Sequence, residues 1–178
     1  TYLGVLERTA QQMHSVRFDT PAQEAAFYQS IQPASGLFDG VFLATAEGKV
    51  TALSPYREGV IGIDITDRDY FQQVTVVDQP TISAPLRNRV GGEPIVILAA
   101  PVHDKDGRLV GLIGASLYLL KPNFLGALRD MHVGQTGRVF LVARGAKPVF
   151  IVHPEADRVL APLHTDPAIE AAFYADPA

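Results

Sequence analysis

Residues 2–16 carry apolar side chains at helical spacing. The apolar positions stand three or four residues apart, which places them on one stripe of an amphipathic helix: Leu3, Leu6, Ala10 and Met13. We expect this stripe to dock on a sheet, or on a second copy of the chain in a homodimer through the N-terminal helix. A second helix is predicted to begin at Thr20-Pro21-Ala22-Gln23, a capping threonine followed by proline and a glutamine that can reach back. It should end near residue 33.

From residue 39 onward the apolar pattern changes to short, strand-like runs. Two runs flank Glu47-Gly48-Lys49, which predicts a hairpin over residues 39–55. Three more strands are predicted, over residues 81–86, 93–104 and 108–120. The turn Asp104-Lys105-Asp106-Gly107 joins the last two, so these should be antiparallel neighbours. A short helix is expected at residues 122–131, and a further helical pattern at residues 168–178.

The hairpin pattern occurs twice. Residues 40–62 recur loosely as residues 138–161: Val-Phe-Leu, a turn with lysine, an apolar strand, then a polar residue before proline, with Pro55 and Pro154 in matching places. Any two apolar hairpins share some of these features, but we favour two related modules in tandem. The predicted α+β organisation has an N-terminal helical segment at residues 1–37 and a first module at residues 38–120. A linker helix and the start of a second, truncated module follow at residues 121–178.

Composition and charge limit the partners. The chain has 178 residues, 47% of them hydrophobic, which is enough for a real core. A net charge of −4 gives no basic surface for a phosphate backbone, so nucleic acid is not an expected partner. The absence of cysteine excludes disulfides and thiolate chemistry. No apolar run reaches the roughly 20 residues that span a bilayer. We expect a soluble segment excised from a longer protein, with segments on either side.

The sequence gives no support for catalysis, a cofactor or a metal. The five histidines stand apart, without the spacing of a close ligand pair: His14, His103, His132, His153 and His164. Glycines in residues 111–116 lie inside an apolar strand, where small residues more often permit close packing than phosphate binding. Asp104 and Asp106 lack the later ligands of a calcium loop and are interpreted as a turn. Ser83 and Ser116 stand in no nucleophile motif.

An ordered set of short motifs resembles the double Cache sensor domain. The motifs are Gly-Ile-Asp-Ile-Thr-Asp-Arg-Asp-Tyr-Phe at 62–71, Ile-Ser-Ala-Pro at 82–85, Pro-Val-His-Asp-Lys-Asp-Gly-Arg-Leu-Val-Gly at 101–111, Gly-Gln-Thr-Gly-Arg-Val-Phe-Leu-Val at 134–142 and Val-His-Pro at 152–154. The resemblance covers nearly the whole chain. It implies PAS-like antiparallel sheets in tandem on a long helix. It also implies a periplasmic position, with the parent chain anchored in the inner membrane by helices on both sides, and signal reception in place of catalysis.

The resemblance also indicates a type of receptor. Arg-Asp-Tyr-Phe and residues 121–137 are most similar to the versions found on bacterial diguanylate cyclases, followed by those of sensor histidine kinases. We therefore expect the sensor of a diguanylate cyclase that binds a small anionic or polar metabolite. The alternatives are the sensor of a histidine kinase or chemoreceptor, or a free-standing binding or adhesion protein. A small hydrolase on this fold also stays open, because a fold does not fix a function.

Arg68 is the central candidate for ligand binding. Thr66 and Asp69 resemble a helix cap, so a short helix should begin near Asp67, with Arg68 and Phe71 on one face. In one interpretation Arg68 forms a surface ion pair with Asp64 or Asp67, which contributes little to stability. In the other, its planar guanidinium lies over the sheet and binds a carboxylate through two parallel hydrogen bonds.

The resemblance implies which residues would surround Arg68. In the amino-acid-binding branch of the family, an Arg-x-aromatic-aromatic pattern holds the ligand carboxylate, and residues 68–71 match it. That branch also carries an aspartate for the ligand ammonium, at the position that Ser116 occupies here. The expected ligand is therefore a small carboxylate without an ammonium group, or another small polar anion. The candidate ligand-binding residues are Arg68, Tyr70, Ser83, Arg87 and Ser116.

Overall fold

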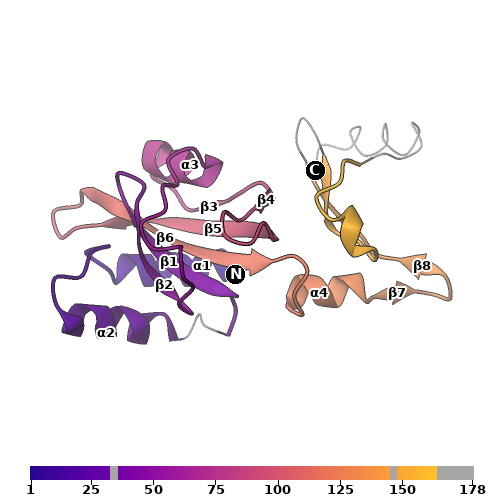
Figure 1. Cartoon of the computed structure of the whole chain (residues 1–178), viewed down its shortest axis with the longest axis horizontal. Helices are drawn as coiled ribbons and strands as arrows, with labels where there is room; N and C mark the ends of the chain where they lie inside the picture. Colours follow the sequence, from indigo (N-terminus) through magenta and orange to yellow (C-terminus); the bar gives the residue numbers. More distant parts are fainter. Residues whose placement is uncertain (33–35, 145–147, 164–178) are drawn as a thin grey trace. The chain divides into compact units, whose positions relative to one another are not determined.

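A computed structural model describes residues 1–32, 36–144 and 148–163 (Figure 1). The chain forms two compact units, Thr1–Tyr118 and Leu119–Ala178. The predicted α+β class, with N-terminal helices and antiparallel sheets, is confirmed. The first unit ends two residues before the predicted boundary at residue 120, and it includes the N-terminal helical segment. The helical pattern expected at residues 168–178, as well as His164, lies outside the described residues.

Two helices open the first unit. They are α1 (Tyr2–Gln11) and α2 (Pro21–Ser30). The predicted cap of α2 is present, because the Thr20 hydroxyl accepts from the Gln23 amide and the Gln23 side chain accepts from the Thr20 amide. α1 ends earlier than the predicted residue 16, although Met13 beyond its end is also buried.

A six-stranded antiparallel sheet forms the centre of the first unit. Its strands are β1 (Gly40–Thr45), β2 (Val50–Ser54), β3 (Thr81–Ile82), β4 (Leu86–Arg87), β5 (Pro94–His103) and β6 (Leu109–Tyr118). The order is β2-β1-β6-β5-β3, and β4 also pairs with β5. The predicted hairpin of β5 and β6 is confirmed: the Asp104 carboxylate accepts from the amides of Asp106 and Arg108 and so closes the turn.

The single strand predicted at residues 81–86 is wrong. The chain instead forms two strands of two residues each, β3 and β4, separated by Ser83-Ala84-Pro85. Pro85 has no amide to donate, which prevents a continuous ladder there. Ser83 still bonds to β5 through its backbone and its hydroxyl.

The two faces of the sheet carry different layers, as Figure 1 shows. On one face, α1 and α2 pack against side chains that alternate along the strands, such as Val41 and Leu43 of β1. On the other face, α3 (Asp69–Val77) packs against the intervening residues, such as Phe42 and Ala44. We call this second surface the α3 face. The candidate residues Tyr70 and Ser116 belong to it, as described below.

The apolar stripe of the N-terminal helix docks on the sheet. Leu6, Ala10 and Met13 are buried in the core between α1 and β5, and Leu3 packs against the same cluster. Of the two alternatives for this stripe, docking on the sheet is therefore the one observed. A homodimer through the N-terminal helix stays a prediction, and Leu3 is the residue of the stripe that is still partly accessible.

The second unit contains short elements. α4 (Phe124–Arg129) is followed by a hairpin of β7 (His132–Val133) and β8 (Gly137–Arg138), and then by a hairpin of β9 (Leu141–Ala143) and β10 (Val149–Val152). A 3-10 turn, η2 (Ala156–Arg158), comes next. The side chain of Asn123 caps α4 by accepting from the amides of Leu125 and Gly126.

The β9–β10 hairpin repeats an irregularity of the β1–β2 hairpin. In the first hairpin the register passes from Val50 to Ala52, so Thr51 has no partner in β1. In the second it passes from Phe150 to Val152, so Ile151 has none in β9. A bulge at equal places sets the same bend and the same facing of side chains in both hairpins.

The segment that follows each hairpin also forms an equivalent backbone hydrogen bond to the second strand of that hairpin. Gly62 donates to the carbonyl of Val50 over 2.8 Å, and Leu160 donates to the carbonyl of Phe150 over 2.9 Å. Both donors have positive φ, 85° for Gly62 and 68° for Leu160, although leucine rarely adopts this conformation. By this pairing Pro154 corresponds to Ser54, so Pro154 and Pro55 match only within one residue. That the second unit begins a second module stays a prediction.

Candidate functional site

α3 begins two residues later than predicted. Arg68 is its N-cap residue, and the helix starts at Asp69. The expected cap between Thr66 and Asp69 does not form, because Thr66 donates instead to the Asp64 carboxylate. The Asp69 carboxylate accepts from the Tyr70 amide over 2.7 Å and from the Ala84 amide over 3.0 Å. This bond to Ala84 fixes the start of α3 to the segment after β3.

Arg68 makes neither of the surface ion pairs considered for it. Asp64 pairs with Lys49 at 2.9 Å, and Asp67 pairs with Arg89. The hydrogen bond from Arg89 holds the pKa of the Asp67 carboxyl below its usual value. The half-buried Arg68 donates through Nη2 to the carbonyl of Arg87 at 3.3 Å, and no carboxylate of the described residues lies within ion-pair distance of it. Its guanidinium therefore keeps donors for a further acceptor.

The ring of Tyr70 lies in the core beneath α3. Its side chain is 4% exposed, and its ring packs edge-to-face on Phe42 with centroids 6.4 Å apart. Burial raises the pKa of the Tyr70 phenol to about 12. The Tyr70 hydroxyl donates to, or accepts from, none of the described residues. The ring is buried, but the hydroxyl oxygen reaches solvent and is therefore available to a bound molecule.

Ser116 lies on the α3 face, in a row across the strands with Gly40 and Ile97. It is the register partner of both Gly40 in β1 and Ile97 in β5. It stands at alternate positions with Leu112 and Tyr118, which belong to the cluster beneath α3. The Ser116 hydroxyl is buried and donates to the Gly40 carbonyl at 3.3 Å. This row therefore carries the hydroxyl of Ser116 and no carboxylate.

Ser83 and Arg87 have structural partners. The buried Ser83 hydroxyl accepts from the Ile97 amide at 2.9 Å, so Ser83 extends the row of Ser116 to the edge of the sheet. The exposed Arg87 donates to the Gly92 carbonyl at 2.9 Å and so closes the loop between β4 and β5. The structure thus brings the backbone of Arg87 beside Arg68 and places Tyr70 and Ser116 on one face. Ser83 serves the sheet itself.

A polar cluster that the sequence did not indicate stands beside these residues. The Arg57 guanidinium pairs with Glu93 at 3.1 Å and lies 5.2 Å from the centroid of the Tyr118 ring. Asn88 donates to Glu93 at 2.9 Å and to the Tyr118 hydroxyl at 3.3 Å. The sequence could have indicated Tyr118, because it stands two positions after Ser116 in β6 and so lies on the same face of the sheet. The loop residues Arg57 and Asn88 carried no such signal.

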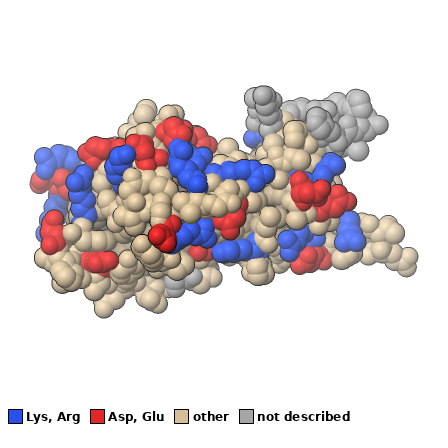
Figure 2. Space-filling view, in the orientation of Figure 1, with Lys and Arg blue, Asp and Glu red and all other residues tan. Residues whose placement is uncertain are grey.

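Charges of both signs are interspersed on the surface. Figure 2 shows Lys and Arg side chains alternating with Asp and Glu over the face in view. Selection of an anion would therefore rest on individual guanidinium groups and not on a broad field. In the described part of the chain, no cluster of three or more potential ligands could hold a metal ion.

Comparison with known sequences decides the family. The sequence profile of the Cache domain matches residues 3–174. The chain belongs to the Cache domain family. It is a ligand-binding sensor domain without catalytic function, and it belongs to the extracytoplasmic part of membrane receptors. The predictions of a Cache sensor, of its non-catalytic nature and of its extracytoplasmic location are confirmed. Within the described residues, no helix has the length and apolarity needed to cross a membrane.

Individual relatives are chemoreceptors and other extracellular receptors. The chain is 28% identical over 120 residues to the methyl-accepting chemotaxis protein McpA of Pseudomonas putida, an alignment that covers 67% of this chain and 18% of that protein. The chain thus spans less than a fifth of this curated relative. The expectation of a diguanylate cyclase receives no support from the comparisons, which favour the chemoreceptor alternative.

Solved structures share the fold. The ligand-binding domain of the Pseudomonas aeruginosa amino acid chemoreceptor PctB, in complex with L-Arg, superposes with a TM-score of 0.67 at 22% identity, covering 90% of this chain and 60% of that one. The domain of PctC from the same organism, in complex with GABA, gives 0.66 at 23% identity, covering 99% and 73%. An extracellular ligand-binding receptor from Desulfohalobium retbaense gives 0.75 at 19% identity, covering 99% and 31%.

Proposed function

We propose that the first unit senses a small organic carboxylate for a chemotaxis-type receptor, and that Arg68 and Tyr70 bind it. The observation that carries this proposal is the Tyr70 hydroxyl, which has no partner among the described residues and reaches solvent from an otherwise buried ring, on the helix whose N-cap residue is Arg68. A carboxylate oxygen at Tyr70 would replace water as the acceptor of its hydroxyl, and a hydrogen bond to a charged group contributes about 1.5–3 kcal/mol.

The carboxylate follows from the chemistry of Arg68. Its guanidinium has one bond to a carbonyl and no carboxylate partner among the described residues. A guanidinium binds a carboxylate through two parallel charge-assisted bonds, which fix orientation as well as charge. Asp67 and Asp64 are held by Arg89 and Lys49, so they do not compete for Arg68.

An amino acid is the second candidate, and the comparisons favour it. Solved neighbours of this fold are described as amino acid chemoreceptor domains in complex with L-Arg and GABA. In this chain the row beneath α3 carries the hydroxyl of Ser116, which cannot neutralise an ammonium. The two candidates therefore differ in whether an amino group strengthens binding or weakens it.

Matched ligand pairs separate these candidates. Thermal-shift measurements would compare L-alanine with propionate and GABA with butyrate, each pair differing by one amino group. Ligand that binds the native state raises the unfolding temperature with concentration. A larger shift for propionate and butyrate supports the carboxylate, and a larger shift for the amino acids supports the second candidate. No shift with any of the four at millimolar concentration contradicts both.

Variants connect the ligand to Arg68. Arg68→Ala should abolish the thermal shift, and Arg68→Lys should restore it only in part, because an ammonium cannot form the bidentate pair. Arg108→Ala is the matched control, since Arg108 pairs with Asp104 and Asp106 in the β5–β6 turn. A ligand that stabilises Arg68→Ala as much as the parent chain would show that Arg68 only supports the β4 loop.

We also propose that the second unit begins a second module of the same kind. Two observations support this: each hairpin has a bulge at the same place, at Thr51 and at Ile151, and the amides of Gly62 and Leu160 donate to equivalent carbonyls of the two hairpins. Leu160→Gly should stabilise the second hairpin by relieving positive φ, as Gly62 does in the first. Hydrogen exchange at the Phe150 amide measures this, and faster exchange in Leu160→Gly would contradict the correspondence.

A further inference from the structure

The correspondence between the hairpins identifies which side of the second one matches the α3 face. Leu43 pairs with Ala52, and Leu141 pairs with Val152, each next to the bulge. Counting back along the strands, Phe140 corresponds to Phe42 and Arg138 corresponds to Gly40. Along the partner strands, Phe150 corresponds to Val50 and His153 to Leu53.

The side chains of the second hairpin confirm this facing. In the first unit, Phe42 and Val50 are buried beneath α3, and Leu53 packs against them. In the second, Phe140 packs edge-to-face on Phe150 with centroids 5.7 Å apart, and Phe150 packs on His153 at 4.8 Å. The same three positions therefore share one face in both hairpins.

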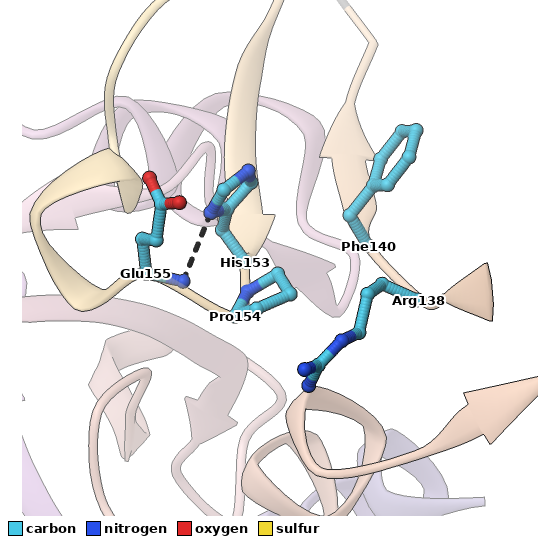
Figure 3. Close-up of a pocket in the computed structure, with 5 residues that line it drawn as sticks. All are labelled: Arg138, Phe140, His153, Pro154 and Glu155. Carbon is cyan, nitrogen blue, oxygen red and sulfur yellow. Dashed lines mark hydrogen bonds between the residues drawn. The ribbon is translucent and has the colours of Figure 1, made fainter. Parts of the chain in front are cut away.

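A pocket opens on this face of the second unit. Its volume is about 460 Å³, within the range of small-molecule sites, and its lining consists of Arg138, Phe140, His153, Pro154 and Glu155. Figure 3 shows Arg138 and Phe140 on one side of the pocket and His153, Pro154 and Glu155 on the other. Arg138 stands at the position of Gly40 in the first hairpin, and His153 at the position of Leu53. The second hairpin therefore carries two polar side chains where the first has a glycine and an aliphatic side chain.

The polar groups of the pocket suit a single anionic group. The Nδ1 atom of His153 accepts from the Glu155 amide at 3.1 Å, so the neutral imidazole carries its proton on Nε2 and donates from there. Arg138 is exposed and has no carboxylate partner among the described residues. Glu155 adds one negative charge to the lining, which disfavours polyanions such as phosphate esters. Phe140, 52% exposed, offers an aromatic face to an apolar group.

We infer that this pocket is a second ligand site, which binds a small monocarboxylate with a flat apolar body. Arg138 and the His153 Nε2–H bind the carboxylate, and Phe140 and Pro154 pack against the body. The inference does not rest on the site proposed at Arg68, because all of these residues belong to the second unit.

Benzoate is a suitable probe, and its neutral isostere benzamide is the control ligand. In ¹H–¹⁵N spectra of the 178-residue chain, benzoate should shift the amide signals of β9, β10 and residues 153–155 in a saturable way. Benzamide should shift them less at equal concentration. Arg138→Ala should weaken benzoate binding about fivefold or more, which corresponds to about 1 kcal/mol. Arg129→Ala, which removes an arginine of α4 outside the pocket, should leave the affinity unchanged.

Two further variants distinguish binding in this pocket from binding at Arg68. Arg68→Ala should leave the benzoate shifts of the second unit unchanged, whatever it does in the first. His153→Phe keeps the ring packing on Phe150 and removes the donor, so it should also weaken binding, and it tests the inference if Arg138→Ala alters the hairpin. The inference is overturned if benzoate shifts only signals of residues 1–118, or if it binds both variants as tightly as the parent chain.

Discussion

The side-chain amide of Asn88 donates a hydrogen bond to the hydroxyl of Tyr118, the last residue of the first unit. Asn88 follows β4 directly, and its side-chain oxygen Oδ1 accepts from the Glu93 backbone amide at 3.1 Å. These bonds hold the loop between β4 and β5 to the end of β6. The Arg87 carbonyl, at the end of β4 directly before this loop, accepts from Arg68, so the loop also helps to position the candidate carboxylate site.

Loss of this link should lower the stability of the first unit. Tyr118→Phe removes one hydroxyl and should reduce the free energy of unfolding by about 0.5–1.5 kcal/mol, whereas Asn88→Ala removes bonds to both Tyr118 and Glu93 and should reduce it by about 1–3 kcal/mol. Hydrogen exchange at β5 and β6 amides, which lie in the first unit, measures both changes. The double variant should lose less than the sum, and full additivity would show that the Asn88–Tyr118 bond contributes nothing.

The regular elements were predictable from sequence because their side chains repeat with a fixed period. The stripe of α1, the capping box of α2 and the β5–β6 hairpin were predicted within a few residues. The Arg68 region was found through its pattern of arginine and aromatic residues. Its details were not predictable, because the Thr66 hydroxyl could bond either to α3 or to Asp64, and the choice depends on tertiary packing.

The remaining differences arise from contacts between distant segments. The burial of Tyr70 depends on Phe42, which is 28 positions earlier and on another element. Similarly, the division of residues 81–86 follows from Pro85 together with the reach of Ser83 to Ile97. The pairs of Arg57 with Glu93 and of Asn88 with Tyr118 join loops to strand ends, where no periodic pattern marks a residue.

Asp64 should make stability depend on acid pH. Its carboxylate accepts from the hydroxyl and amide of Thr66 and from Lys49, and these bonds, those of Thr66 first, hold its pKa well below the usual 3.8. The unfolded chain therefore gains the proton first, so the contribution of Asp64 is present above pH 3.8 and is lost as the pH falls below it. Asp64→Asn should lose stability at pH 7 and show a weaker decline toward pH 2.

Urea unfolding at several pH values tests this expectation. Lys49→Gln is a comparison variant in which a smaller effect is expected, because Lys49 lowers the pKa of Asp64 less than Thr66 does. It should retain most of the acid dependence that Asp64→Asn loses. An acid profile of Asp64→Asn that parallels the parent profile would contradict the assignment.

Gly114 should be essential to the position of Phe42 and hence of Tyr70. A Cβ at residue 114 would overlap the Phe42 ring, which packs on Tyr70. Gly114→Ala should therefore destabilise the first unit by about 1–3 kcal/mol, because overpacking shifts side chains and backbone. Gly36→Ala is the matched control, since its Cβ would meet no atom within 4 Å. Thermal unfolding compares the two, and equal unfolding temperatures would show that Phe42 can move without penalty.

Tyr70→Phe should separate ligand binding from folding. In the free protein the Tyr70 hydroxyl bonds to no described residue, so its removal should change the free energy of unfolding at pH 7 by less than about 1 kcal/mol, or raise it. A hydrogen bond to a carboxylate contributes about 1.5–3 kcal/mol, so the affinity for propionate or another binding carboxylate should fall about tenfold or more.

The alkaline titration of Tyr70 gives an independent check. Burial raises its folded pKa from 10.0 to about 12, so the unfolded chain loses the proton first as the pH rises. The stabilising contribution is thus complete below pH 10 and is lost as the pH rises through 12. In Tyr70→Phe the decline of stability above pH 10 should be shallower than in the parent chain. If the variant unfolds with the parent profile and binds carboxylates as tightly, the hydroxyl of Tyr70 lies outside the site, and the proposed function loses the observation that carries it.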